Sequence, residues 1–209
     1  MTSDKRYPSI LMFGPPGVGK GTQGKILGSV PGFFHLSVGD VFRSIDIGSP
    51  EGIEICKHTS QGHFVPDELT IQIWKKALDA YVALSFFKPR EDLLILDGIP
   101  RNVAQTELVK DHIDIVHVIN FSYTDQEDMV KRMQRRAIRE NRADDANEEV
   151  IRKRFEIFHE VSKPVLDCYP EEIISTVESQ GSPAEILRNI LRFVIPIQNE
   201  HFTSELQSS

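Results

Sequence analysis

The sequence Gly14-Pro15-Pro16-Gly17-Val18-Gly19-Lys20-Gly21-Thr22-Gln23 directly follows a short apolar run, residues 10–13, that has the length of a buried strand. Within it, Gly14, Gly19 and Lys20 have the spacing of a phosphate-binding loop that joins a strand to a helix. Glycine permits the unusual backbone dihedrals that point consecutive N–H groups into one concave nest, and the helix adds its positive N-terminal end. The alternative is a Gly/Pro-rich turn that binds nothing, which the preceding strand and the register of the lysine disfavour.

The residues around the lysine indicate a nucleotide as the ligand. Lys20 supplies a full positive charge, which can reach the β- and γ-phosphates. The general motif places Ser or Thr directly after the lysine, but here Gly21 takes that position and Thr22 follows one residue later. The sequence therefore predicts a nucleotide site with one departure from the general pattern.

The overall composition limits the kind of protein. A chain of 209 residues with 40% hydrophobic residues is long enough for one α/β domain with small insertions. Its net charge of −7 argues against a nucleic-acid or membrane-surface partner, because both are polyanions. Cys56 and Cys168 show neither metal-ligand spacing nor a disulfide framework, which favours a reducing cytoplasm. The N-terminus lacks the apolar core of a signal peptide, and no apolar run is long enough to span a bilayer.

Strand and helix patterns alternate along the chain. Short apolar runs predict strands over residues 10–13, 33–36, 93–96, 113–121 and 173–177. Helical patterns predict helices over residues 24–30, 66–85, 125–138, 148–169 and 183–194, with a short helix after residue 37 and a break at Pro164. Residues 50–61 form a further polar-flanked stretch. Trp74 lies at a core position of its helix, and the polar tail, residues 196–209, is expected to fray. The alternation predicts an α/β fold with a parallel five-stranded sheet covered by helices on both faces.

A carboxylate ends one of the buried strands. Asp97 directly follows residues 93–96, at the end of the strand where the ligands of parallel sheets bind. In a protein that has a phosphate loop, this carboxylate is placed to hold Mg²⁺, directly or through water. By itself, an aspartate at such a position would more often be a helix cap or a turn residue.

The chain is strongly basic between residues 131 and 154, although its net charge is negative. Arg132 and Arg136 stand at i and i+4, so they project from one face of the predicted helix. A solvated helix face with Asp/Glu pairs is the simpler interpretation of such a charge run. Phosphoryl transfer between two nucleotides, however, brings several negative charges together, and the planar fork of arginine grips phosphate oxygens bidentately. Arg43 and Arg101, on other segments, could add positive charge from the other side of the phosphates.

Taken in order, these motifs resemble those of the adenylate kinases, which are nucleoside-monophosphate kinases, and the resemblance runs from residue 10 to residue 194. The phosphate loop of that family includes the shifted Thr22. The monophosphate-binding segment of the family resembles residues 36–43 and 62–68, and its next signature resembles Asp97-Gly98-Ile99-Pro100-Arg101 with Gln105. The residues that resemble its basic helix and lid are Arg132, Arg136, Arg142, Asp144, Asp145 and Arg154.

The resemblance implies a role for each matched residue. Those that would hold ATP are Gly17, Val18, Gly19, Lys20, Gly21 and Thr22, with Arg132 near the base. Those that would hold the acceptor monophosphate are Ser37, Val38, Arg43, Val65, Gly98, Arg101 and Gln105. Those that would act on the migrating phosphoryl group are Lys20, Arg101, Arg136, Arg142 and Arg154. Asp40 and Asp97 would organise Mg²⁺ through its water shell.

The resemblance also implies a domain organisation and a reaction. The fold would be a P-loop three-layer core over residues 1–209, with a monophosphate-binding insert (37–66) and a lid (136–146) too short for the cysteine-bearing zinc version. No zinc is therefore expected. The reaction would be the reversible Mg²⁺-dependent transfer of the γ-phosphoryl group of ATP to AMP, by a cytoplasmic monomer. Because the acceptor oxygen is already ionised, no general base is required. The inserts must close before transfer, because water would otherwise act as the acceptor.

Some residues leave open which nucleoside monophosphate accepts the phosphoryl group. Val38 cannot hydrogen-bond to a base, and Asn102 is the residue expected of pyrimidine monophosphate kinases, so a UMP/CMP kinase is the near alternative. A nucleotide-binding module without turnover is the distant alternative, although a pure binder has little use for so many converging arginines. Ile99, where the family usually has phenylalanine, is interpreted as a packing change, and Lys153 is a rival for the role of Arg154.

Overall fold

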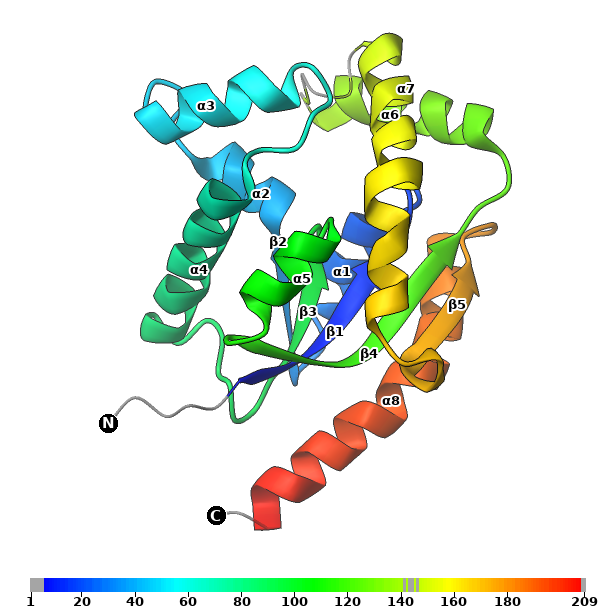
Figure 1. Cartoon of the computed structure of the whole chain (residues 1–209). Helices are drawn as coiled ribbons and strands as arrows, with labels where there is room; N and C mark the ends of the chain where they lie inside the picture. Colours follow the sequence, from blue (N-terminus) through cyan, green and yellow to red (C-terminus); the bar gives the residue numbers. More distant parts are fainter. Residues whose placement is uncertain (1–5, 141, 143–144, 146, 208–209) are drawn as a thin grey trace.

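The computed structural model describes residues 6–140, 142, 145 and 147–207. Its centre is a sheet of five strands in the order β2-β3-β1-β4-β5 (Figure 1). The strands are β1 (Tyr7–Phe13), β2 (Phe33–Ser37), β3 (Leu93–Asp97), β4 (Ile113–Ser122) and β5 (Ile174–Glu178). Every neighbouring pair is parallel, which confirms the predicted sheet.

Apolar residues on both faces explain why the sheet is buried. Successive side chains of β1 point to opposite faces, so Leu11 joins one core cluster and Ile10 joins the other. Trp74 of α4 (Asp67–Ala83) packs fully buried in the first cluster, as its helical spacing predicts. Ile190 of α8 (Pro183–Gln207) packs in the second cluster. Helices therefore cover both faces, and the result is the predicted three-layer α/β fold.

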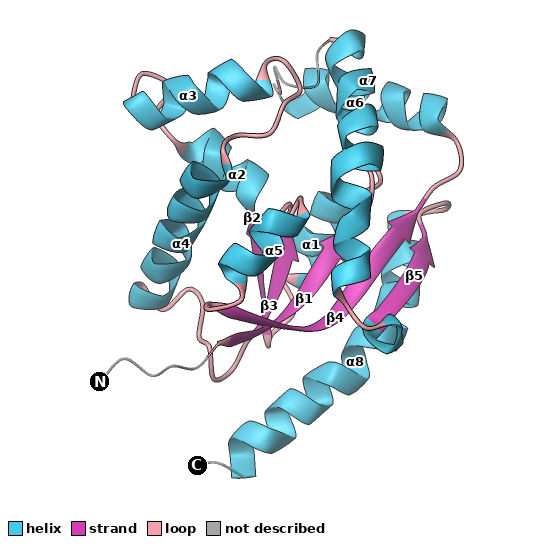
Figure 2. Ribbon diagram, viewed as in Figure 1, coloured by secondary structure: helices cyan, strands magenta, loops and turns pink. Residues whose placement is uncertain are grey.

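Helices also rise above one end of the sheet. Besides α4 and α8, the α-helices are α1 (Lys20–Leu27), α2 (Val38–Ser44), α3 (Pro50–Thr59), α5 (Val103–Val109), α6 (Gln126–Glu140) and α7 (Glu148–Ile157). The strand arrows of Figure 2 point toward α3, α6 and the beginning of α7, which stand beyond the carboxyl ends of the strands. The loops that leave β1, β2 and β3 therefore open toward these helices.

α1 begins at Lys20, so the predicted start at Gly24 was wrong. The backbone N–H of Gln23 donates to the oxygen of Gly19 at 3.0 Å, which is the first helical hydrogen bond. Glycine normally weakens a helix interior, but Gly24 has a packing reason to be there, since a Cβ at this position would lie 2.3 Å from Nε2 of His35. The helix packs closely on β2 and starts directly at the phosphate loop.

The chain after α7 changes its helical type. α7 ends at Ile157, and a π turn follows over Phe158–Ser162. Pro164 then lies near the start of a 3₁₀ helix over Lys163–Cys168. The predicted break at Pro164 is therefore present, and it is spread over a longer segment than a single kink.

α8 is longer than predicted, because it runs through Pro196 to Gln207, where the sequence predicts a frayed tail. Ile197 packs against the second core cluster, and Nε2 of Gln198 donates to the backbone oxygen of Pro31 at 2.9 Å. These tertiary contacts hold the helix together past a proline that removes one backbone hydrogen bond. None of the helices in the described ranges, α8 included, is long and apolar enough to cross a membrane.

Candidate functional site

A cavity of about 400 Å³ lies at the carboxyl ends of the central strands. Phe13, Ser37 and Asp97, the last residues of β1, β2 and β3, all line it. Ligands of open parallel sheets bind at this end, because the loops that leave the strands meet there. Residues of α2, α3, α6 and α7 also line the cavity, so segments far apart in the sequence converge on it.

The glycine-rich loop after β1 has the backbone shape of a phosphate cradle. Gly14, Gly17 and Gly19 have φ angles of 145°, 77° and 104°, in the region that favours glycine. The Nζ atom of Lys20 donates to the backbone oxygen of Gly14 at 2.7 Å and to that of Pro15 at 3.0 Å. The ammonium group therefore lies against the loop, beside the N-terminus of α1, whose first N–H groups have no helical acceptor.

The electrostatic environment of Lys20 is already positive. Burial lowers the pKa of Lys20 to about 8, and the Asp97 carboxylate acts in the opposite direction. The positive charges of Arg101, Arg154 and Arg136 lower this pKa further. These arginines act on the lysine because they line the same cavity, and the interaction of two charges strengthens as the distance between them falls. A polyanion would be attracted to this field.

Arginines from separate elements line the cavity together with Lys20. They are Arg43 of α2, Arg101 of the loop after β3, Arg136 of α6, Arg142 of the segment after α6, and Arg154 of α7. Burial lowers the pKa of Arg142, and the neighbouring charges of Arg136 and Arg43 act in the same direction. Five of the arginines that the sequence singled out therefore meet at one place, whereas Arg132 does not line the cavity.

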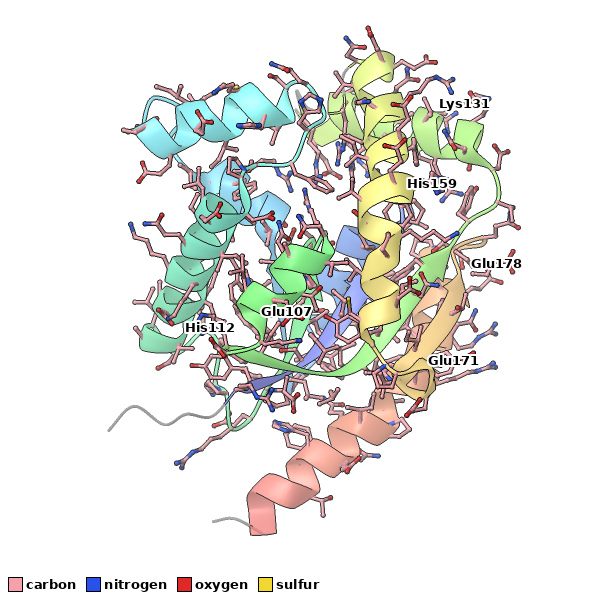
Figure 3. The ribbon with its side chains drawn as sticks, in the orientation of Figure 1. Glu107, His112, Lys131, His159, Glu171 and Glu178 are labelled. Carbon is pink, nitrogen blue, oxygen red and sulfur yellow. The ribbon has the colours of Figure 1, made fainter. Side chains whose placement is uncertain are left out.

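Other cations of α6 point elsewhere. Lys131, which Figure 3 labels, is exposed, and so are Arg135 and Arg139. The interpretation of this charge run as a solvated helix face therefore applies to one side of α6, whereas Arg136 on the other side faces the cavity.

Asp145 holds two of the arginines in place. Its side chain is 0% exposed, and it accepts a hydrogen bond from Nε of Arg136 at 2.9 Å. Nη2 of Arg136 and Nη1 of Arg154 also donate to its oxygens. Lys153 instead donates to Glu156 at 3.0 Å on the surface, so Arg154 and not its rival faces the cavity. The sequence placed Asp145 in the lid motif without a role, although an acid among arginines was a signal for one.

Arg101 is held on the other side of the cavity. Its Nε donates to the backbone oxygen of Gly98 at 2.7 Å, and its guanidinium lies 5.5 Å from the ring centroid of Phe64. Gly98 has a φ of 85°, and a Cβ there would lie 2.9 Å from Nη2 of Arg101. Phe64 and Phe42 both line the cavity and were not identified from the sequence, although they lie within the matched monophosphate segments.

Comparison with known proteins identifies the family. Residues 12–174 match the sequence profile of the family described as Adenylate kinase. The adenylate kinase of Leptospira biflexa is 36% identical over 193 residues, which cover 88% of this chain and 98% of that protein. The chain belongs to the adenylate kinase family. The adenylate kinases of Corynebacterium glutamicum and Thermus thermophilus are 34% and 32% identical, with 88% and 87% of this chain and 97% and 94% of theirs covered. Adenylate kinases are phosphotransferases, so the chain is an enzyme of that class.

Most of the residues that the resemblance to adenylate kinases singles out line the cavity. They are Gly17, Gly19, Lys20, Gly21, Ser37, Asp40, Arg43, Asp97, Gly98, Arg101, Arg136, Arg142 and Arg154. Val18, Val38 and Val65 are instead buried in the protein core, and Thr22 is exposed outside the cavity lining. Asp144 lies outside the described residues.

Gln105 and Arg132 are engaged with other side chains. Gln105 is buried, its Oε1 accepts from the backbone N–H of Arg101 at 2.8 Å, and its Nε2 donates to Asp67 at 2.7 Å. The guanidinium of Arg132 lies 4.8 Å from the ring centroid of Tyr123. Neither side chain is among those that line the cavity.

Asp40 and Asp97 are the carboxylates of the cavity. Burial acts to raise the pKa of Asp97, but the nearby His35, whose Nε2 lies 3.8 Å from Oδ2 of Asp97, and the positive charges of Lys20 and Arg101 together outweigh it, so the pKa is lowered. Burial acts the same way on Asp40, but its hydrogen bond to Arg43 and the positive charges of Arg43, Lys25 and Arg142 together outweigh it, so that pKa is lowered too. Both groups are therefore ionised at neutral pH, and they offer the hard oxygen ligands that suit Mg²⁺. Within the described residues there is no cluster of three or more His, Cys, Asp or Glu arranged to hold a metal, and Mg²⁺ that arrives with a nucleotide takes further ligands from phosphate and water.

Proposed function

We propose that the chain catalyses the reversible transfer of the γ-phosphoryl group of Mg·ATP to AMP, which yields two molecules of ADP. The observation that carries the proposal is the convergence of the cavity arginines and Lys20 above the phosphate loop. Two nucleotides bring several negative charges together, and fixed positive charge around them reduces the repulsion. Membership of the adenylate kinase family supports the same reaction.

We assign the ATP half of the site to the phosphate loop and the start of α1. The backbone N–H groups of residues 17–22 cradle the phosphates, and Lys20 neutralises the β- and γ-phosphates. Lys20 then exchanges its bonds to the loop carbonyls for bonds to phosphate oxygens. Arg132 is assigned to the ATP base, because its guanidinium, already stacked on Tyr123, can cover one face of an adenine.

We assign the acceptor half to α2 and to the loop after β3. Arg43 and Arg101 hold the α-phosphate of the monophosphate, because their planar forks match its oxygens. The remaining residues of the acceptor site are Ser37, Val38, Val65, Gly98 and Gln105. Since Gln105 does not line the cavity, its contact with the base requires neighbouring residues to move.

Arg136, Arg142 and Arg154 are assigned to the migrating phosphoryl group. In-line transfer spreads charge over the equatorial oxygens, and guanidinium groups placed around them stabilise that charge. The attacking oxygen belongs to a phosphate that is ionised at neutral pH, so no side chain has to remove a proton. Asp40 and Asp97 would hold Mg²⁺ through water, and the ion would neutralise charge at the β- and γ-phosphates.

We also propose that residues 37–66 and residues 136–146 are inserts that close over the cavity. Gly62 lies against α7, where a Cβ would be 2.9 Å from the backbone oxygen of Val150. Nη2 of Arg142 lies 3.9 Å from Oδ1 of Asp40, so the lid segment approaches α2. Closure excludes water, which is the competing acceptor. Residues 141, 143, 144 and 146 of the lid are not among those described.

AMP is better supported as the acceptor than UMP or CMP. Asn102 was the feature that favoured a pyrimidine, yet its Nδ2 donates to both oxygens of Asp67 at 3.0 Å each. Its Oδ1 accepts from the backbone N–H of Gln105 at 2.7 Å, as the N-cap of α5. These contacts explain the presence of Asn102 without a pyrimidine acceptor. The relatives named above, moreover, are adenylate kinases.

We further propose that the protein works as a monomer in a reducing cytoplasm. Cys56 and Cys168 are both free and exposed, and an oxidising compartment would leave such thiols open to reaction. The residues assigned to both nucleotides belong to one chain, so a partner copy is not needed to complete the site.

A panel of AMP, GMP, UMP and CMP, each incubated with Mg·ATP and monitored for diphosphate formation, tests the proposal. AMP should give ADP with the highest kcat/KM. Faster turnover of UMP or CMP would establish a pyrimidine monophosphate kinase. Tight nucleotide binding without any diphosphate product would establish the non-catalytic module.

A further inference from the structure

A chain of hydrogen bonds connects α4 with the arginine assigned to the acceptor phosphate. Asp67 is the first residue of α4 and is partly buried. Its Oδ1 accepts from Nε2 of Gln105 at 2.7 Å, and both of its oxygens accept from Nδ2 of Asn102 at 3.0 Å. Oε1 of Gln105 in turn accepts from the backbone N–H of Arg101 at 2.8 Å.

The neighbours of Gln105 determine how its amide is oriented. A carboxylate only accepts and a backbone N–H only donates, so the amide nitrogen faces Asp67 and the amide oxygen faces Arg101. Asn102 is oriented by the same rule, because its oxygen caps α5 and its nitrogen faces Asp67. Gln105 is 1% exposed, so water cannot readily take the place of the Asp67 carboxylate there.

The side chain of Arg101 leaves this network toward the cavity. Its Nε donates to the backbone oxygen of Gly98, and its guanidinium lies over the ring of Phe64. Phe64 and Asp67 belong to the same short segment, residues 64–67, which leads into α4. This segment therefore contacts the guanidinium of Arg101 directly and holds its backbone through Gln105.

We propose that Asp67 is a positioning residue for the acceptor nucleotide, whose carboxylate orients the amides of Gln105 and Asn102 and, through them, Arg101. The proposal rests on the proposed function, in which Arg101 is assigned to the acceptor phosphate. Because residues 64–67 span the C-terminal end of the monophosphate-binding insert (37–66), the same contacts link the position of that insert to Arg101.

The variant Asp67→Asn tests this link, and Glu68→Gln is its matched control. Asparagine keeps the shape of the side chain, but one of its two oxygens becomes an NH₂ group that faces other donors. Glu68 stands in the same first turn and is exposed, so Glu68→Gln removes the same charge at the helix N-terminus and leaves the network in place. Asp67→Asn should raise the KM for AMP about 5- to 30-fold and leave the KM for ATP within about twofold of the wild-type value. Glu68→Gln should change neither value.

A merely structural role would lower stability without affecting AMP more than ATP. Equal increases of the two KM values, or values equal to those of the control, would overturn the proposal. In a Gln105→Ala background, Asp67→Asn should raise the KM for AMP by less than about twofold, because the amide that connects Asp67 with Arg101 has already been removed. An undiminished additional effect in that background would also overturn it.

Asn102→Ser provides a second test, which applies even where Asp67→Asn does not fold. Serine keeps an oxygen for the N-cap of α5 but removes the donor to Asp67. The KM for AMP should rise about 2- to 5-fold while the KM for ATP stays constant, and an unchanged KM for AMP would overturn the proposal. A wild-type protein that forms no ADP from AMP would refute the proposed function instead, so the two failures are distinguishable.

Discussion

Replacing Asp145 with asparagine should disable phosphoryl transfer and leave both nucleotides able to bind. The carboxylate accepts hydrogen bonds from Arg136 of α6 and Arg154 of α7. Asparagine has the same shape but offers one oxygen, and its NH₂ group would face a guanidinium that only donates. At least one of the two arginines should therefore leave its position near Lys20.

The expected magnitudes follow from burial and geometry. The side chains of Arg136 and Arg154 are 26% and 23% exposed, so water can partly replace the lost bonds. We therefore expect the free energy of unfolding to fall by about 2–3 kcal/mol, which is less than the ~3–5 kcal/mol typical of a broken, fully buried pair. A displacement of about 1 Å at the reacting centre costs about 100-fold in rate, and this is the expected fall in kcat. The KM values should change little, because Arg43, Arg101 and the phosphate loop are untouched.

The assay is steady-state formation of ADP from ATP and AMP, combined with urea unfolding of the same samples. Asp114→Asn is a matched control, since Asp114 lies 3.8 Å from Arg6 in an exposed ion pair and should tolerate the change. If folded Asp145→Asn keeps a kcat within about threefold of the wild-type value, the positions of Arg136 and Arg154 do not limit transfer, and the reasoning is refuted.

Three further changes test other parts of the molecule. Lys20→Met should lower kcat by about 10²–10³-fold in a folded protein, and a near-normal rate of ADP formation would exclude its role. Gly24→Ala should destabilise the protein by about 1–3 kcal/mol in urea unfolding, because the Cβ would overlap the ring of His35; a more stable variant, as expected for an ordinary helix glycine, would contradict that contact. Burial lowers the pKa of His117 below 6.5, so only the unfolded state binds a proton as the pH first falls below this value. Stability should therefore decrease as the pH falls through 6.5 toward the lowered pKa, and His117→Gln should reduce that slope; parallel melting-temperature curves for the two proteins would contradict it.

The sequence correctly predicts those parts of the fold that depend only on residues close together in the chain. The phosphate loop, the five strands and the break at Pro164 each depend on a few adjacent side chains. The end of α8 could not be found in this way, because Ile197 and Gln198 hold the helix past Pro196 through contacts with distant parts of the chain. The start of α1 was missed for the same reason, since the glycine at position 24 packs against β2.

The composition of the site was easier to predict than the contacts that hold it. Arginine is the residue type that phosphoryl transfer between nucleotides needs, so its clustering pointed to the chemistry and the resemblance placed each arginine. The spacing of residues in the sequence does not show which side chains bind one another when they lie on separate elements. Asp145 binds Arg136, and Asp67 binds the amide of Gln105, across such a separation. Likewise, Val38 and Val65 matched a binding motif, yet both side chains are buried in the core.

The central idea is that one positively charged cavity holds two nucleotides at once, and the most direct measurement is calorimetric binding of a diadenosine polyphosphate, in which one phosphate chain carries an adenosine at each end. One equivalent should bind and should prevent the binding of both ATP and AMP. The affinity should fall as ionic strength rises and should fall again in Arg136→Ala. Binding of two equivalents, or displacement of ATP while AMP still binds, would contradict the idea.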